Sequence, residues 1–459
     1  MPTHFDAIVI GTGQAAPALA SRLSGAGQKV AIVERKLFGG TCVNTGCIPT
    51  KTLVASASAA QAVRRASEFG VTAGEPAVDM KAVKARKDKI SGSSREGVEK
   101  TVRGLPNGTV YTGHARFESP REVRVGDEVL TAEKIFINVG GRATTRDIEG
   151  LDQVPYWTNS SMMGVDFLPP HLVIVGGSYV GLEFAQMYRR FGSKVTVVEM
   201  SNRLIAREDE DVSAEIRSIL EREGIAVRTG AKCIALEKGP SGVRVQVDCD
   251  EEPKFVDGTH LLLAVGRRPN TDDLGLERAG IATDDRGYIR VDDQLRTNVD
   301  GIWALGDCNG RGAFTHTAYN DFEIVAANLL DGDPRKVSDR IEAYALYVDP
   351  PLGRCGMTEA AARKAGRRIL IAKRAMSRIS RAVEKGETQG FMKIVVDAES
   401  KQILGAAILG VGGDEIIHTV LDVMYAKAPW TVIRGAMHIH PTVSELVPTM
   451  LGELKPMDG

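Results

Sequence analysis

Near its N-terminus the chain alternates a short apolar run, a glycine-rich turn and a longer segment of mixed polarity. Residues 7–10 are continuously apolar and lead directly into Gly11. A second apolar run at 30–33 ends in Glu34, and the residues between the two runs suit a helix that extends to about Ser24. Short apolar runs bounded by glycine indicate buried strands, so we predict a strand, a helix and a second strand here.

The same pattern returns in the middle of the chain. Apolar residues 172–175 lead into Gly176, the predicted helix extends to about Phe191, and an apolar run at 195–198 ends in Glu199. The same number of positions separates the first glycine from the closing glutamate in both copies. The chain therefore contains an internal duplication of one strand–helix–strand unit.

Both units carry the residue types that a dinucleotide site requires. The first glycine allows a tight turn, the next small residue lets the backbone approach a pyrophosphate, and the third keeps the helix close to the strand. The helix N-terminus offers N–H groups to the phosphates, and the closing acid accepts hydrogen bonds from a ribose diol. These positions are Gly11, Gly13, Ala16 and Glu34 in the first unit and Gly176, Ser178, Gly181 and Glu199 in the second. Ala16 and Ser178 depart from glycine but are small, so we predict two dinucleotide sites.

Cys42 and Cys47 follow the first unit, within the stretch 39–51. Pro49 suits the first turn of a helix, which places Cys47 at a helix N-terminus. There the helix dipole lowers the pKa of a thiol and favours the thiolate. A zinc site usually has a second pair of ligands, and no further Cys/His pair lies nearby. We therefore predict a redox-active dithiol and no resident metal site.

Composition narrows the class of protein. The 459 residues suit about three domains, and their 43% apolar content is ordinary for a globular chain. A formal net charge of -1 provides no basic surplus, so we expect no nucleic-acid partner. Neither a membrane-spanning apolar run nor room for a signal peptide precedes the first strand, and six cysteines are too few for a disulfide scaffold. We expect a cytoplasmic protein in which four further cysteines are structural: Cys233, Cys249, Cys355 and Cys308, the last directly after Asp307.

The stretch 39–51 and the two units resemble the dimeric flavoprotein disulfide reductases, the FAD-dependent pyridine nucleotide-disulfide oxidoreductases. This family includes dihydrolipoamide dehydrogenase, glutathione reductase and mercuric reductase, and the resemblance covers essentially the whole chain. It implies an α/β fold with two Rossmann-like dinucleotide-binding domains and a C-terminal α+β dimerisation domain. The implied boundaries are 1–150 and 271–340 for FAD binding, 151–270 for NAD(P)H binding and 341–459 for the interface. In the last segment, the apolar runs 391–396 and 403–408 predict an antiparallel hairpin.

The resemblance also implies which residues bind the two cofactors. Asp307 would hold the ribityl chain of FAD, Lys51 and Glu183 would pair beneath the flavin, and Tyr179 would gate the nicotinamide pocket. Residues 137–141 lie where the family usually has an Ala-Thr-Gly run. The implied FAD-binding residues are Gly11, Gly13, Ala16, Glu34, Gly40, Thr41, Lys51, Gly140, Gly306 and Asp307. The implied NAD(P)H-binding residues are Gly176, Ser178, Tyr179, Gly181, Glu199 and Gly266.

His440 and Glu445 form a candidate acid–base pair near the C-terminus. Thr442 and Glu445 also have the spacing of a capping box that opens the last helix. In the family, the glutamate orients the histidine, which exchanges protons with the cysteines of the other subunit. The resemblance therefore implies a homodimer whose active sites are shared between chains, with Cys42 attacking substrate and Cys47 lying against the flavin.

The substrate is the least determined feature. Glu199 favours NADH over NADPH because an acid repels a 2′-phosphate, although Arg203 and Arg207 lie close by. The segments 314–320 and 443–451 resemble the mercuric-reductase-like branch, but the last cysteine is Cys355 and no C-terminal cysteine pair is present to relay metal ions. We expect a reductase of a small-molecule disulfide or metal ion. Dihydrolipoamide dehydrogenase and glutathione reductase are the enzymatic alternatives, and a redox-sensing flavoprotein with little turnover is the alternative of another class. The roles of Cys308 and His316 stay open.

Overall fold

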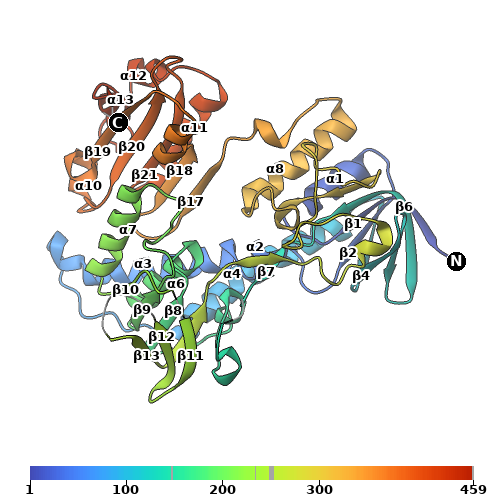
Figure 1. The fold of residues 1–459 in the computed structure, drawn as a ribbon, viewed down its shortest axis with the longest axis horizontal. Helices are drawn as coiled ribbons and strands as arrows, with labels where there is room; N and C mark the ends of the chain where they lie inside the picture. The colour runs from blue at the N-terminus through green and yellow to red at the C-terminus, as the bar shows by residue number, and fades with distance from the viewer. Residues whose placement is uncertain (146–147, 233, 248–252, 457–459) are drawn as a thin grey trace.

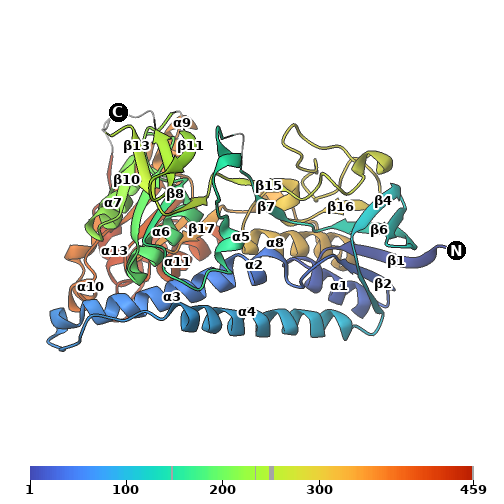
Figure 2. The same ribbon diagram turned by 90° about the horizontal axis from the view of Figure 1, so that it is seen from below.

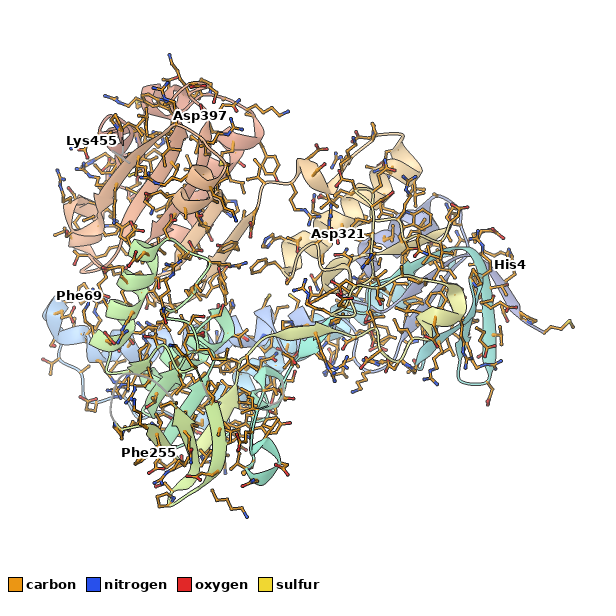
Figure 3. All side chains as sticks on the ribbon, in the orientation of Figure 1. His4, Phe69, Phe255, Asp321, Asp397 and Lys455 are labelled. Atoms are coloured by element: carbon orange, nitrogen blue, oxygen red, sulfur yellow. The ribbon has the colours of Figure 1, made fainter. Side chains whose placement is uncertain are left out.

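The computed structural model describes residues 1–145, 148–232, 234–247 and 253–456. Figure 1 shows three groups of elements: an N-terminal sheet with α1 and α8, a central group around α6, and a C-terminal sheet with α11 to α13. Figure 3 places His4 on the N-terminal sheet, and Asp397 and Lys455 in the C-terminal group. The described residues contain no helix that is long and apolar enough to cross a membrane.

The first predicted unit forms the middle of a seven-stranded sheet. Its strands run in the order β3-β2-β1-β6-β5-β4, with β16 beside β6, and β1 pairs in parallel with both β2 and β6. Ala7 and Val9 face one apolar core and Ile8 and Ile10 face another, so β1 is buried on both sides. The elements are β1 (Thr3–Ile10), α1 (Ala16–Gly25), β2 (Val30–Glu34), β3 (Gly108–Thr112), β4 (Ala115–Ser119), β5 (Glu122–Val125), β6 (Glu128–Ile137) and β16 (Ile302–Ala304).

The second predicted unit forms a parallel sheet with the order β10-β9-β8-β14. Beside it lies a small antiparallel sheet, β11-β12-β13. The elements are β8 (His171–Val175), α6 (Tyr179–Phe191), β9 (Lys194–Val198), α7 (Glu210–Arg222), β10 (Ala226–Arg228), β11 (Ile234–Gly239), β12 (Gly242–Val247), β13 (Phe255–Gly258) and β14 (His260–Leu263). Both strand–helix–strand predictions are confirmed.

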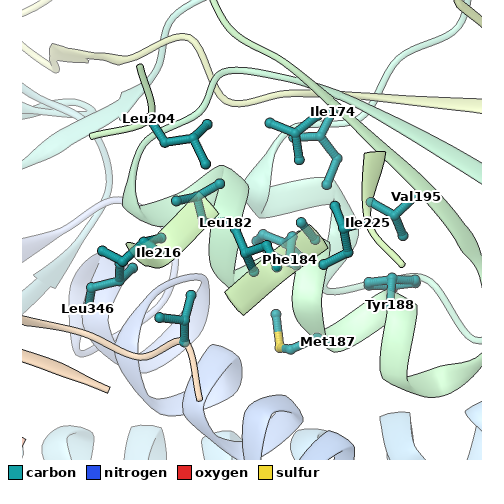
Figure 4. Close-up of a cluster of buried hydrophobic side chains, with 14 of the residues drawn as sticks. Ile174, Leu182, Phe184, Met187, Tyr188, Val195, Leu204, Ile216, Ile225 and Leu346 are labelled. Carbon is teal, nitrogen blue, oxygen red and sulfur yellow. The ribbon is translucent and has the colours of Figure 1, made fainter. Parts of the chain in front are cut away.

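The apolar core around α6 connects the central group to its neighbours. Leu182, Phe184 and Tyr188 of α6 lie among the side chains of the parallel sheet, and Leu346 joins them from the C-terminal group (Figure 4). Leu53 of α3 belongs to the same buried cluster. One continuous core contains α6 and the helix that begins at Cys47. The N-terminal end of α6 therefore has a fixed position relative to that helix.

Two long helices run side by side beneath the other elements, as Figure 2 shows. They are α3 (Cys47–Arg64) and α4 (Met80–Arg103), and α2 (Gly40–Asn44) precedes them. Pro49 lies in the first turn of α3, as predicted, and α3 packs against both α4 and α6. The other connecting elements are β7 (Gly141–Ala143), α5 (Asn159–Met162), β15 (Arg267–Pro269) and α8 (Thr315–Ala326).

The C-terminal group contains a six-stranded sheet in the order β17-β18-β21-β20-β19-β22. The predicted hairpin is confirmed, since β20 and β21 pair antiparallel. The strands are β17 (Ala343–Leu346), β18 (Leu352–Gly356), β19 (Ile369–Ala375), β20 (Phe391–Asp397), β21 (Ile403–Leu409) and β22 (Lys455–Pro456). The helices are α9 (Glu359–Lys364), α10 (Ser380–Glu384), α11 (Gly413–Tyr425), α12 (Thr431–Gly435) and α13 (Leu446–Leu451).

Candidate active site

A cavity of about 1170 Å³ runs from the first glycine-rich turn to the cysteine pair and on to the start of α6. Its volume exceeds that of most small-ligand pockets and suits a dinucleotide. Most of the residues predicted to bind FAD line it: Gly11, Gly13, Glu34, Gly40, Thr41, Lys51, Gly140, Gly306 and Asp307. Ala16 does not line the cavity, because it is buried at the start of α1. Of the residues predicted for NAD(P)H, Tyr179 lines it, whereas Gly176, Ser178, Gly181, Glu199 and Gly266 lie around the central sheet.

The glycine-rich turn at residues 11–13 leaves room for the phosphates of a cofactor only because Gly11 and Gly13 have no side chains. Gly11 has a φ of +95°, and a Cβ there would lie 2.4 Å from the carbonyl oxygen of Asn138. A Cβ on Gly13 would lie 2.8 Å from Oδ1 of Asn138. This cradle fits the pyrophosphate of FAD, which must approach the backbone closely.

Glu34 and Glu199 hold the two turns in the same way. Oε2 of Glu34 accepts hydrogen bonds from the backbone N–H and the hydroxyl of Thr12, at 3.1 and 2.6 Å. Oε2 of Glu199 accepts from the N–H of Gly177 at 2.6 Å, and its Oε1 accepts from the N–H of Ser201 at 2.7 Å. Each acid therefore fixes its turn while lying where a ribose is expected. Sequence reasoning missed this second role.

A buried network supports the Gly306–Asp307 turn. Asp321 of α8, labelled in Figure 3, accepts hydrogen bonds from the N–H of Gly306 at 2.8 Å and from Arg340 at 2.5 Å. Burial raises the pKa of Asp307, and Arg267, 3.5 Å away, partly opposes the rise. Asn138 also lines the cavity, and its Nδ2 donates to the carbonyl of Leu305 at 2.9 Å. Asp321 and Arg340 have no motif that would reveal them in the sequence.

The cysteine pair lies where α2 meets α3. Cys47 is the first residue of α3, and its Sγ lies 3.2 Å from the hydroxyl of Thr315, the first residue of α8. The hydrogen bond from Cys42 lowers the pKa of Cys47 to about 6, with further help from Thr315 and Lys51 against the effect of burial. The same hydrogen bond and burial raise the pKa of Cys42. The reduced pair therefore divides into a Cys47 thiolate and a Cys42 thiol near neutral pH.

Lys51 and Glu183 form an ion pair in the cavity wall. The Lys51 ammonium donates to both carboxylate oxygens of Glu183, at 2.8 and 2.7 Å. The backbone N–H of Tyr347 donates to Glu183 at 3.1 Å, and the Tyr347 ring lies 4.5 Å from the ammonium. The pair joins α3 to α6, so the cysteine helix and the central sheet share one charged contact.

Tyr179 opens α6 and lies in a group of aromatic rings with Phe314 and Tyr344. The Nε of Arg207 donates a hydrogen bond to the Tyr179 hydroxyl at 2.7 Å. Burial raises the pKa of Tyr179 to about 12, while the Arg207 charge opposes the rise. Arg207 was considered in the sequence only as a possible phosphate ligand, and the structure gives it this partner instead.

His440 and Glu445 are paired, as predicted. The Nδ1 of His440 lies 3.1 and 3.0 Å from the two carboxylate oxygens of Glu445. The His440 side chain is 76% exposed and does not line the cavity of its own chain. The expected capping box is wrong, because α13 begins at Leu446 with Glu445 as its N-cap; the N–H of Glu445 donates to the Thr442 hydroxyl at 3.2 Å in the turn before the helix, and its carboxylate binds His440. Met437 and Ile439, which precede His440 in the chain, are exposed, which suits a surface that another protomer covers.

Cys308 and Cys355 lie outside this chemistry, whereas His316 lines the cavity. Burial raises the pKa of both Cys308 and Cys355 to about 12, so neither is a reactive thiol near neutral pH. Cys233 and Cys249 lie outside the described residues. The Nε2–H of His316 bonds the carbonyl of Ala343 at 2.7 Å, and its ring stacks on Phe314. His316 therefore links α8 to β17.

Comparisons with known proteins agree along the whole chain. The family model described as pyridine nucleotide-disulphide oxidoreductase matches residues 5–321, and its dimerisation domain matches residues 343–451. The probable pyridine nucleotide-disulfide oxidoreductase RclA of Escherichia coli is 36% identical, over 96% of this chain and 97% of that protein. A mercuric reductase of Streptomyces lividans is 34% identical, over 96% and 94% of the two chains. A dihydrolipoyl dehydrogenase of Thermus scotoductus is also 34% identical, over 96% and 95%.

Among solved structures, a Cu(II) complex of the HOCl-induced flavoprotein disulfide reductase RclA from Escherichia coli superimposes with a TM-score of 0.89. It is 34% identical and covers 99% of this chain and 100% of that one. The fold is therefore shared from end to end, including the C-terminal sheet.

Proposed function

Since the chain belongs to the pyridine nucleotide-disulphide oxidoreductase family, we propose that it is an FAD-dependent NAD(P)H reductase of a small-molecule disulfide or a soft metal ion. Family membership makes it an FAD-dependent enzyme that uses a pyridine nucleotide, and the dimerisation domain supports a homodimer. The observation that carries the acceptor class is the position of Cys42 and Cys47 together in the cavity wall, with Cys47 at the N-terminal end of α3 and its Sγ 3.2 Å from the Thr315 hydroxyl. Such a pair passes two electrons by thiol–disulfide exchange.

We propose that segments 1–150 and 271–340 bind FAD, that 151–270 binds NAD(P)H and that 341–459 forms the dimer interface. Gly11, Gly13 and Gly40 would receive the pyrophosphate, Glu34 the adenosine ribose and Asp307 the ribityl chain. When bound, the flavin supplies two-electron chemistry between the nicotinamide and the cysteine pair. The ion pair of Lys51 and Glu183 would lie beside the flavin ring, with each charge held in place by the other.

NADH is the preferred coenzyme in this proposal. Glu199 presents a carboxylate at the end of β9, which favours a free 2′-hydroxyl and repels a 2′-phosphate. Arg203 donates to the carbonyls of Ala206 and Glu208 at 2.9 and 3.3 Å, and Arg207 is bonded to Tyr179. Arg203 is thus engaged elsewhere, which supports NADH.

The reaction with a disulfide follows from the two sulfurs. Sγ of Cys42 attacks one sulfur of the acceptor and forms a mixed disulfide, and the first thiol leaves. Sγ of Cys47 then attacks Cys42, closes the Cys42–Cys47 disulfide and releases the second thiol. The protein dithiol is oxidised by two electrons and the acceptor becomes two thiols. We propose that His440 of the partner subunit, oriented by Glu445, takes the proton of the Cys42 thiol as its Sγ attacks and gives that proton to the departing sulfur.

A soft metal ion fits the same pair. Thiolates bind and reduce copper, and closure of the disulfide would supply one electron to each of two Cu(II) ions. The comparison with RclA, solved as a Cu(II) complex, and with a mercuric reductase supports this part of the proposal.

An acceptor panel tests the function. Lipoamide, glutathione disulfide, Cu(II), Hg(II) and a quinone would each be offered to the purified holoenzyme with NADH and with NADPH. We expect turnover with a disulfide or a metal ion, and loss of that turnover in Cys42→Ser while the flavin is still reduced by NADH. Quinone as the sole acceptor, with Cys42→Ser fully active, would contradict the proposal. A stable reduced state without turnover on any acceptor would favour a redox sensor.

A further inference from the structure

Arg207 holds Tyr179 by two interactions at once. Its Nε donates to the Tyr179 hydroxyl at 2.7 Å, and its guanidinium carbon lies 4.5 Å from the centre of the same ring. A charged donor makes a stronger hydrogen bond than a neutral one, and a cation over an aromatic ring adds further attraction. Tyr179 therefore cannot leave its place in the cavity wall without losing both contacts.

The arginine is itself anchored to a different part of the chain. Its guanidinium carbon lies 4.2 Å from the centre of the Tyr344 ring, and its Nη1 lies 3.8 Å from a carboxylate oxygen of Glu342. Both residues belong to the start of the C-terminal group, at β17. Phe314 adds a third ring, 5.6 Å from the guanidinium, from the segment before α8. Arg207 thus connects the central sheet to the cavity wall and to the C-terminal sheet.

The buried acid Glu208 fixes the position of the Tyr344 side chain. The Tyr344 hydroxyl donates to Glu208, and Arg354 lies 3.5 Å from the other oxygen of Glu208. The side chains of Glu208 and Arg354 are 0% and 2% exposed. The hydrogen bond to buried Glu208 holds the Tyr344 side chain in place, so Tyr344 offers Arg207 a fixed surface.

We propose that Arg207 is a positioning residue that latches the Tyr179 side chain over the nicotinamide pocket. The inference rests on the proposed function and on the role that the family resemblance implies for Tyr179, which is to gate that pocket. A ligand that needs the open pocket binds with an affinity reduced by the fraction of molecules that are open. The latch therefore lowers the affinity for nicotinamide dinucleotides, and its removal raises that affinity.

Calorimetric titration of the oxidised holoenzyme with NAD⁺ tests the latch without electron transfer. Arg207→Met keeps the length of the side chain but removes the charge and the donor, and we expect NAD⁺ to bind about tenfold more tightly, the effect of losing one charge-assisted hydrogen bond. Arg207→Lys keeps the charge without the guanidinium fork and should fall between Arg207→Met and wild type. Arg217→Met removes a partly exposed arginine from α7 of the same group and should bind NAD⁺ as wild type does.

A second background separates a latch from a general effect on the pocket. In Tyr179→Ala the ring is absent, so the added Arg207→Met change should leave the affinity unaltered. Weaker NAD⁺ binding in Arg207→Met would overturn the latch and make Arg207 a direct ligand of the dinucleotide. Equally tighter binding in both backgrounds would overturn the latch as well, because the effect would then not depend on Tyr179. Wild-type enzyme whose flavin is reduced by neither NADH nor NADPH would instead overturn the proposed function. Normal flavin reduction with unchanged affinity in Arg207→Met would overturn the latch alone.

Discussion

The Sγ atom of Cys47 and the Oγ1 atom of Thr315 lie 3.2 Å apart, across the contact between the N-terminal ends of α3 and α8. After the hydrogen bond from Cys42, this contact is one of the interactions that favour the Cys47 thiolate. We expect Thr315→Val, which keeps the shape and removes the hydroxyl, to raise the pKa of Cys47 from about 6 toward the ordinary thiol range. The ultraviolet absorbance of the thiolate, followed against pH in the reduced protein, measures it. An unchanged titration would show that the Thr315 hydroxyl does not help to set the pKa of Cys47.

The ion pair of Lys51 and Glu183 predicts two changes of opposite sign in the pKa of Cys47. The Lys51 charge lowers the pKa of Cys47 and the Glu183 charge raises it. Lys51→Met should therefore raise the pKa of Cys47, and Glu183→Gln should lower it, in the same thiolate titration. Because each variant breaks the same pair, a shift in one common direction would mean that structural disturbance, rather than charge, dominates.

The choice between NADH and NADPH can be tested without breaking the glycine-rich turn at 176–178. Glu199→Arg removes the hydrogen bonds that Glu199 accepts from Gly177 and Ser201, so it changes both charge and loop structure. Met200 is 51% exposed, and Met200→Arg would add a cation for a 2′-phosphate while leaving Glu199 in place. We expect kcat/KM for NADPH relative to NADH to rise in both variants, by roughly tenfold in Met200→Arg, as for one new ionic hydrogen bond. Equal ratios in Met200→Arg and wild type would move the discriminating position elsewhere.

Lys393 of β20 ties the C-terminal sheet to the start of α7. Its ammonium lies 2.9 Å from Asp209 and 2.8 Å from Asp211, and its side chain is 2% exposed. Loss of one partner of a buried ion pair costs about 3 kcal/mol or more, so Lys393→Met should lower the free energy of unfolding by that amount. Lys373→Met removes a 43% exposed partner of Asp211 and should cost about 1 kcal/mol or less. Urea denaturation compares the two, and similar losses would contradict the role of burial.

The ion pairs of Lys393 with Asp209 and Asp211 also predict how the stability of the fold changes with pH. Although burial favours the neutral acids, the hydrogen bonds from lysine hold the pKa values of Asp209 and Asp211 below their ordinary range. A carboxyl group with a lowered folded-state pKa stabilises the fold above its unfolded pKa and loses that effect as the pH falls through the folded pKa. Wild-type stability should therefore fall on acidification below about pH 4, and Lys393→Met should show a shallower fall.

The duplicated units and the cysteine stretch could be predicted because their chemistry is local in sequence. Apolar runs, glycine turns and the proline after Cys47 determine both where the strands and helices form and where Cys47 lies. The pairing of Lys51 with Glu183 needed the family resemblance, since the two residues come from distant helices.

Contacts between groups could not be predicted in this way. Thr315, Arg207, Asp321 and Lys393 act through partners far along the chain, and each resembles an ordinary surface or helix residue in the sequence. Their roles follow from the packing of α6, α8 and the C-terminal sheet against one another, which no local pattern encodes. The capping box expected at Thr442 shows the same limit, because α13 begins three residues later than the spacing predicts and Glu445 bonds His440.

The exposed His440 predicts that one protomer alone cannot complete the active site. His440→Ala and Cys42→Ser should each lose disulfide or metal-ion turnover while their flavin is still reduced by NADH. In a two-fold dimer that shares its sites, a mixed dimer of these variants has one site with both Cys42 and His440 intact. Equal mixing, after dissociation and reassociation, makes half of the dimers mixed, so about a quarter of wild-type turnover should return.

The matched control for this complementation is a mixture of Cys42→Ser and Cys47→Ser. Both cysteines of a site come from one chain, so every site in that mixture lacks a cysteine and no turnover should return. If mixtures of His440→Ala and Cys42→Ser stay as inactive as this control, although mass spectrometry detects the mixed dimer, His440 does not act across the interface. Recovery close to a quarter would place His440 of one protomer at the cysteine pair of the other, as its exposure in the single chain leads us to expect.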